Sequence, residues 1–236
     1  MENKKRGSFS GGIGFVLAAA GSAVGLGNLW RFPYLAAQYG GGIFILVYII
    51  LALTFGFTLM TTEIAIGRKT KLSPTRAYGN IDKRFAFIGP ISFIIPVIIL
   101  PYYCVIGGWV IKYVTVFATG QDMAAADGLF FANFIGQEYA PLVFFFIFLG
   151  LTALIVVLGV EKGIEKVSKY LMPVLILLAI VICIYIMFIP GAGAGIKYYL
   201  LPDFSKFSFK TVCAAMGQMF YSMSLAMGIM ITYGSY

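Results

Sequence analysis

The sequence predicts an all-α polytopic membrane protein. Its 236 residues are 61% hydrophobic and only 11% charged, whereas soluble domains carry about 25% charged residues. Apolar runs of about 20 residues, the length that crosses a bilayer, recur along the chain between short polar segments. Backbone polar groups inside a bilayer must be satisfied within the protein, so these runs are expected to be helices.

Six spans are expected from the apolar runs and their flanking turn or charged residues. They are approximately Gly12–Gln38, Ile43–Gly67, Phe85–Ala118, Pro141–Val160, Tyr170–Ile189 and Thr211–Tyr236. The third is too long for one straight crossing, so we expect a tilt or an amphipathic lead-in.

The basic residues indicate how these spans are oriented. With the N-terminus in the cytoplasm, the cytoplasmic side collects twelve of the 17 lysines and arginines, as the positive-inside rule requires. We therefore expect a multi-pass protein of the plasma membrane. Its expected parts are a cytoplasmic segment (residues 1–11), helices 1 to 5 (12–189), an extracellular loop (190–210) and helix 6 (211–236).

Composition also argues against several functional classes. The net charge of +8 belongs to the loops that flank the spans, so it does not indicate a nucleic-acid partner. Histidine is absent, and the three cysteines have no metal-ligand spacing; we expect them to be buried free thiols. No nucleophile–base pair or carboxylate pair is evident, so an enzyme is not expected.

The first span is interrupted at its centre by Gly21–Asn28, which precedes Arg31-Phe32-Pro33. Glycine costs about 1 kcal/mol relative to alanine inside a helix, and the Asn28 amide needs polar partners at that depth. Irregular backbone is tolerated there only where it is buried in protein or lines a watery cavity. The segment therefore predicts a broken helix at a binding site.

A second polar interruption, Gln218–Gly228, lies in the sixth span, five spans after the first. Inverted repeats of five helices with discontinuous first helices are typical of many secondary transporters. Unwinding frees carbonyl groups for a small cation and exposes half-helix N-termini that suit a carboxylate.

Plainer explanations exist for each of these residues. The serines and glycines of both interruptions suit ordinary close contacts between helices. Asn28 could belong to a structural network, and Arg31 could extend to the membrane interface. Glu63 could pair with Arg68 near the end of its helix, and Tyr103 could belong to an interfacial aromatic belt.

Taken together, several motifs resemble the neurotransmitter:sodium symporter family over essentially the whole chain. They are Ala20–Pro33, Gly40–Gly42, Glu63–Arg68, Tyr102–Tyr103, Lys162–Lys166 and Gln218–Tyr236. The first motif is highly specific. The resemblance implies the leucine-transporter-like inverted-repeat fold, of which this chain would hold the first five-helix repeat and the sixth helix in truncated form.

The resemblance also implies sodium-coupled symport of an amino acid, with two sodium sites and an open question about chloride. The sodium ligands it implies are Gly21, Ala23, Val24, Asn28 and Ser222. The substrate-binding residues it implies are Ser22, Ala23, Leu26, Gly27, Ile99, Tyr103, Tyr221, Ser222, Ser224 and Met227. Glu63 would support the unwound segments. The gating residues would be Arg6, Phe9, Arg31, Gln218 and Tyr236.

Gly25 bears on the substrate class. In monoamine members of the family this position holds an aspartate that pairs with the substrate amine. Glycine here implies that the substrate brings its own carboxylate, which favours an amino acid. Ala226 stands where the family usually has glycine, and Met227 is flexible and apolar. We expect a neutral, hydrophobic amino acid.

The family pattern also contains a second five-helix repeat, so this chain is expected to be about half of a transporter and inactive alone. Whether Tyr236 is a true C-terminus stays open. The expected partners are the amino acid, the lipid bilayer and a second copy in a homodimer of the full-length protein. The alternative functions are a non-transporting membrane fragment and a channel-like subunit.

Overall fold

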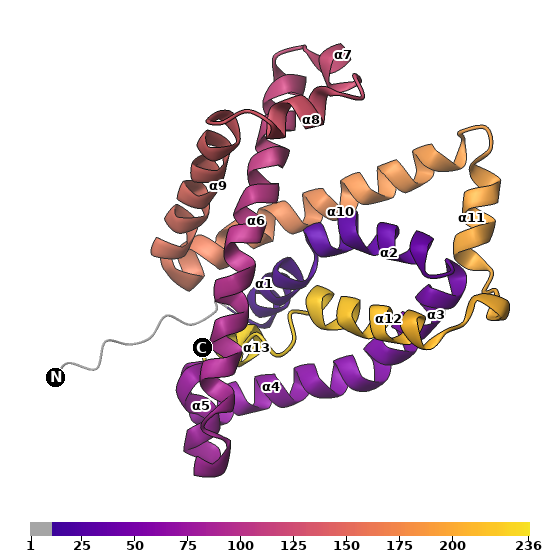
Figure 1. The fold of residues 1–236 in the computed structure, drawn as a ribbon. Helices are drawn as coiled ribbons and strands as arrows, with labels where there is room; N and C mark the ends of the chain where they lie inside the picture. Colours follow the sequence, from indigo (N-terminus) through magenta and orange to yellow (C-terminus); the bar gives the residue numbers. More distant parts are fainter. Residues whose placement is uncertain (1–10) are drawn as a thin grey trace. The chain divides into compact units, whose positions relative to one another are not determined.

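The computed structural model describes residues 11–236, which form helices joined by short connections (Figure 1). These residues divide into two compact units. The first unit contains the described residues up to Phe93 together with Glu165–Tyr236, and the second is Ile94–Ile164.

The first two spans belong to the first unit, and both are irregular. Span one consists of α1 (Gly12–Ala23), a π-helical turn (Gly27–Arg31) and α2 (Phe32–Gln38), with a bend of 47° between its halves. The break lies inside the segment where the sequence predicts it. Span two consists of α3 (Gly42–Leu51), a π-helical turn (Ala52–Gly56) and α4 (Phe57–Thr70).

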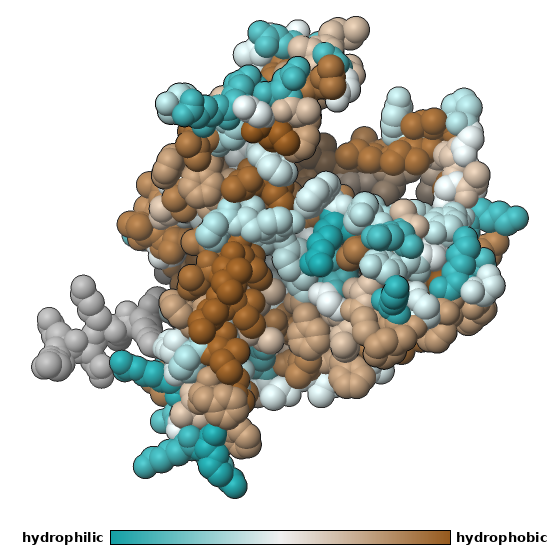
Figure 2. Space-filling view, viewed as in Figure 1, coloured by the Kyte–Doolittle hydropathy of each residue, from teal (hydrophilic) through white to brown (hydrophobic). Residues whose placement is uncertain are grey.

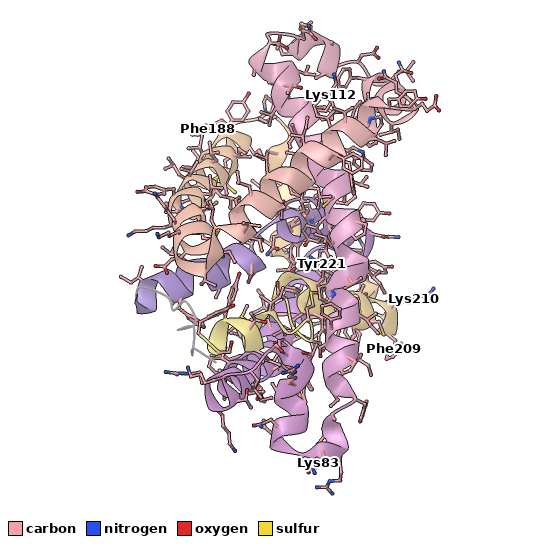
Figure 3. All side chains as sticks on the ribbon, turned by 90° about the vertical axis from the view of Figure 1, so that its left-hand side faces the viewer. Lys83, Lys112, Phe188, Phe209, Lys210 and Tyr221 are labelled. Atoms are coloured by element: carbon pink, nitrogen blue, oxygen red, sulfur yellow. The ribbon has the colours of Figure 1, made fainter. Side chains whose placement is uncertain are left out.

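The chain then forms α5 (Pro74–Ile81) and enters α6 (Ile88–Ala118), which contains Pro96 and Pro101. Figure 2 shows apolar side chains along the flank of α6, with hydrophilic side chains near both of its ends. In Figure 3, Lys83 lies just before one end of α6 and Lys112 lies toward the other. This pattern suits a helix that crosses a membrane.

The second unit holds most of α6, α7 (Asp122–Ala125), α8 (Phe130–Ile135) and α9 (Ala140–Val157). Its main polar feature is Lys112, whose ammonium lies 5.6–5.9 Å from the ring centroids of Phe130, Phe134 and Phe144. Such cation–π contacts compensate a positive charge that has left water. They also join α6, α8 and α9.

The first unit is completed by the last four helices. These are α10 (Lys166–Met187), α11 (Ala192–Leu200), α12 (Phe209–Ser222) and α13 (Ile229–Gly234). Helix α11 is attached to the second half of span one, because the hydroxyls of Tyr198 and Tyr199 donate to the carbonyls of Ala37 and Pro33, both at 2.8 Å.

Helices α4 and α13 pack closely through glycines. A Cβ at Gly67 would meet the carbonyl of Ile231, and one at Gly234 would lie 2.5 Å from the carbonyl oxygen of Ile64. Small residues allow this approach, as is usual between membrane helices. This contact brings the end of span two against the last helix.

By length and composition, four helices of the described chain suit a membrane crossing, and the bent pair of span one would be a fifth. The interruption of the sixth span leaves α12 and α13 short. The prediction about cysteines is right for Cys104, which is buried, and wrong for Cys183 and Cys213, which are exposed. In a chain of lipid-facing helices, apolar side chains need not be covered by protein.

Candidate functional site

The break in span one leaves backbone oxygens without partners. The Val24 N–H completes α1 by donating to Ala20, and the N–H groups of Asn28 and Leu29 then both donate to Gly25 at 3.0 and 3.1 Å. Within the described residues, no backbone N–H donates to the carbonyl oxygens of Gly21, Ala23 or Val24. Buried carbonyls are rarely left unpaired, so these oxygens are candidates for an ion or a substrate.

Asn28 adds a further oxygen on the same break. Its Oδ1 atom is buried and has no hydrogen-bond partner within the described residues. A buried amide oxygen without a donor costs about 1–3 kcal/mol, which makes it a second kind of candidate ligand at this break.

The break in span six is longer and conformationally more demanding. Helix α12 ends at Ser222 and α13 begins at Ile229. Between them, Ser224, Ala226 and Gly228 have left-handed φ values of 54°, 61° and 73°. For residues with a Cβ this conformation costs about 1–2 kcal/mol each, so other contacts must hold the segment.

Two hydrogen bonds join the breaks. The Ser224 hydroxyl donates to the Ser22 carbonyl at 2.8 Å. The fully buried Gln218 donates from Nε2 to the Gly27 carbonyl and to Ser222 Oγ, both at 2.8 Å. Its Oε1 atom is buried and has no hydrogen-bond partner among residues 11–236. Because α12 is held against span one in this way, the polar groups of both breaks belong to one site.

Span two contributes Glu63, whose side chain is 6% exposed. Its Oε1 atom accepts a hydrogen bond of 2.7 Å from the N–H of Ala226. No ion pair of Glu63 is present in the part of the chain that the structure describes, so the alternative of a pair with Arg68 is not realised here. The carboxyl group is directed to the break of span six.

Tyr221, labelled in Figure 3, packs against the break of span one. A Cβ at Gly27 would lie 2.7 Å from its ring, so glycine is needed for the approach. The Arg31 guanidinium lies 4.9 Å from the centre of the same ring. Gln218, which the resemblance assigns to an outer gate together with Arg31, bridges the two breaks in this structure; the gating role of both residues stays a prediction.

The structure thus brings together, in the first unit, the predicted residues of both breaks. Met227 and Leu26 lie within the breaks themselves and are partly buried. Ile99 and Tyr103 lie on α6 in the second unit, so their part in the site stays a prediction.

The predicted inner gate is described only in part. Arg6 and Phe9 lie outside the described residues. Tyr236 helps to line a cavity of about 330 Å³ near the start of α1, together with Phe15, Arg68 and Tyr233. The gating roles of all these residues stay predictions.

Sequence reasoning missed two residues that shape the second break. A Cβ at Gly56 would lie 2.6 Å from the Met223 sulfur, and a Cβ at Gly228 would lie 2.5 Å from the ring of Pro74. The available signals were a glycine inside the apolar run of span two and a Ser-Pro pair after it. Neither signal indicates a partner more than 150 residues away, because such contacts depend on how the helices pack.

A helical membrane protein with two interrupted spans that share one oxygen-lined site has the architecture of secondary transporters. The model of the sodium:neurotransmitter symporter family matches residues 6–124 and 132–236. The chain therefore belongs to this family.

Individual relatives agree with this assignment. A protein of Bacillus subtilis described as an uncharacterized sodium-dependent transporter, YhdH, is 36% identical over all of this chain and 53% of its own length. A sodium- and chloride-dependent taurine transporter of Bos taurus is 29% identical over 95% of this chain and 43% of its own. The chain spans about half the length of these relatives.

A solved structure agrees as well. The crystal structure of MhsT in complex with L-phenylalanine is similar with a TM-score of 0.91 and 37% sequence identity. The similarity covers 98% of this chain and 54% of MhsT. The expected fold class, the first part of a leucine-transporter-like structure, is thereby confirmed.

Proposed function

We propose that this chain supplies the first half of a sodium-coupled symporter for a neutral amino acid with a hydrophobic side chain. The observation that carries the proposal is a set of oxygens on the break of span one for which the described residues supply no hydrogen-bond donor. Carbonyls of Gly21, Ala23 and Val24, with Asn28 Oδ1, are the ligand types that a small hard cation takes.

The proposed cation sites share these oxygens with Ser222. Its Oγ accepts from Gln218 and keeps a lone pair for an ion. Two sodium ions are proposed, one at Ala23, Asn28 and Ser222 and a second at Gly21 and Val24. Chloride dependence stays open. It is worth testing because the relatives include sodium- and chloride-dependent taurine transporters.

Gly25 supports the proposed substrate class. A Cβ built at Gly25 would have no neighbour within 4 Å among the described residues. The position therefore has room for the acidic side chain that would pair with an amine, but offers no such side chain. A substrate that carries its own carboxylate would fill this space and complete the coordination of the nearby sodium ion.

The hydrophobic side chain of the substrate is proposed to contact Tyr221, Met227, Ile99 and Tyr103. The similarity to MhsT, which has been crystallised in complex with L-phenylalanine, supports an apolar amino acid. The taurine transporters among the relatives are 28–29% identical, so taurine is the alternative substrate to test.

We also propose the plasma membrane as the location, with a cytoplasmic N-terminus, because this orientation places most lysines and arginines inside. A homodimer of the full-length protein is a further expectation from the family resemblance.

The test is uptake by the full-length protein in proteoliposomes under a sodium gradient. We expect saturable uptake of labelled L-phenylalanine that is lost when potassium or choline replaces sodium. Uptake that is indifferent to this replacement would refute the proposal, and preference for taurine would correct the substrate class.

A matched pair of variants locates the ion site. Asn28→Ala should raise the sodium concentration for half-maximal uptake about tenfold or more, since each 1.4 kcal/mol of lost interaction is a tenfold change. Asn133→Ala, at an exposed position in α8, should leave it unchanged.

A further inference from the structure

Glu63 is a buried acid whose charge is not compensated. One carboxyl oxygen accepts the Ala226 N–H at 2.7 Å, while Oε2 is buried and has no hydrogen-bond partner within the described residues. Burying an ionised carboxylate costs several kcal/mol unless it is paired and fully hydrogen-bonded. Burying the protonated, neutral carboxyl group costs much less, even when one oxygen lacks a partner. This environment therefore favours the protonated form of Glu63 over the carboxylate.

Glu63 has no ion pair within the described part of the chain. Helix α5 presents Tyr78, the titratable group whose electrostatic contact with Glu63 is evident, and Arg76, which is exposed. Helix α13 presents Tyr233. The basic residues of α4 itself, Arg68 and Lys69, lie in its last turn, away from the Ala226 contact.

Tyr78 lies near Glu63 and forms a hydrogen bond with the hydroxyl of Ser92. Burial raises the pKa of Tyr78, the negative charge of Glu63 in its ionised form raises it further, and a hydrogen bond with Ser92 opposes both effects. Ser92 is only 3% exposed. Glu63 thus lies near a second polar pair, Tyr78 and Ser92, on the side of α5 and the start of α6.

The same carboxyl group holds the break. Ala226 has a left-handed φ of 61°, and its N–H is fixed by Glu63. A hydrogen bond to an ionised carboxylate is about twice as strong as one to a neutral group. Gain or loss of a proton at Glu63 therefore changes how firmly this segment is held.

We propose that Glu63 is a proton-binding site coupled to the break of span six, protonated when the proposed cation site at Asn28 and Ser222 is empty and deprotonated when that site fills. The link is the break itself, because it begins directly after Ser222 and its Ala226 N–H is held by Glu63; a positive ion at the break favours the carboxylate. By reciprocal linkage, the proton weakens sodium binding by the same factor. This coupling rests on the proposed sodium site, whereas proton binding at Glu63 does not.

The direct test is infrared spectroscopy of the purified full-length protein near neutral pH, using Glu63→Gln and, as a matched control at an exposed position, Glu138→Gln. We expect a protonated-carboxyl band in sodium-free buffer that is lost in Glu63→Gln and retained in Glu138→Gln. A band that both variants retain, or no such band in the parent protein, would overturn the proposal.

Sodium titrations then test the coupling. In the parent protein, adding sodium should diminish the band, and sodium affinity should rise with pH by up to about tenfold per unit, the limit for exchange of one proton. In Glu63→Gln the affinity should be independent of pH. A pH-independent affinity in the parent protein would refute the coupling.

The two proposals fail differently. Absence of sodium binding together with loss of the band in Glu63→Gln would refute the sodium site and leave the proton site standing. If Glu63→Gln does not fold, a second measurement on the parent protein is used. A pH indicator in weak buffer then reports whether sodium binding releases protons. Binding without proton release would then overturn the coupling.

Discussion

The two interrupted spans break their helices with different backbone conformations. The break in span one covers only Val24–Leu26 and continues directly into a π-helical turn. No residue between Gly12 and Gln38 has a positive φ. The break in span six covers Met223–Gly228 and contains three left-handed residues, two of which carry a Cβ.

The two breaks therefore differ in how much backbone strain they contain. Span one loses hydrogen bonds but gains little strain, because its glycines make the bend inexpensive. Span six is strained, and partners on other helices stabilise it: Glu63 at Ala226, Pro74 at Gly228 and Ser22 at Ser224. The first break is therefore a local property, and the second depends on its neighbours.

The largest effect is expected at Gly228. Gly228→Ala imposes a left-handed conformation on alanine and places a Cβ 2.5 Å from the Pro74 ring, so we expect about 2–4 kcal/mol of destabilisation. Ala226→Gly should do the opposite and stabilise by about 1 kcal/mol, because glycine removes the strain there. Thermal unfolding of the purified full-length protein in detergent measures both. Equal and small effects would show that the second break is not strained.

The next effect distinguishes two glycines of the first break. Gly27→Ala places a methyl group 2.7 Å from the Tyr221 ring and should destabilise by about 1–3 kcal/mol. Gly25→Ala meets no described atom within 4 Å and should leave the unfolding midpoint nearly unchanged. Its effect should appear instead in substrate affinity. Similar unfolding midpoints for both variants would contradict the close approach of α12 to span one.

The smallest effect concerns the hydrogen bond between the two breaks. Ser224→Ala removes the donor to the Ser22 carbonyl and should cost about 1 kcal/mol. Ser22→Ala is the control, because its hydroxyl donates to Ala19 within the same helix at 2.8 Å; we expect only a few tenths of a kcal/mol. The same unfolding assay applies, and a larger effect of Ser22→Ala would argue against a bond that joins the breaks.

Much of the fold could be predicted because membrane helices can be recognised from the length and composition of their apolar runs. The break of span one was predictable for the same reason, since glycines and Asn28 are out of place in an apolar helix. The left-handed backbone of Ser224 and Ala226 was not predictable, because neither residue type favours it. The internal role of Gln218 was also missed, since a glutamine in a helix has no preferred partner in the sequence.

The sequence by itself determined that the chain has helices long and apolar enough to cross a membrane and where the first span breaks. These properties follow from local chemistry: hydrophobic length, glycine content and an amide at membrane depth. Only the tertiary structure decided that Gln218 bridges the two breaks, that Tyr221 lies against Gly27 and that Glu63 holds Ala226. These contacts join residues 160 or more positions apart, so packing alone can create them.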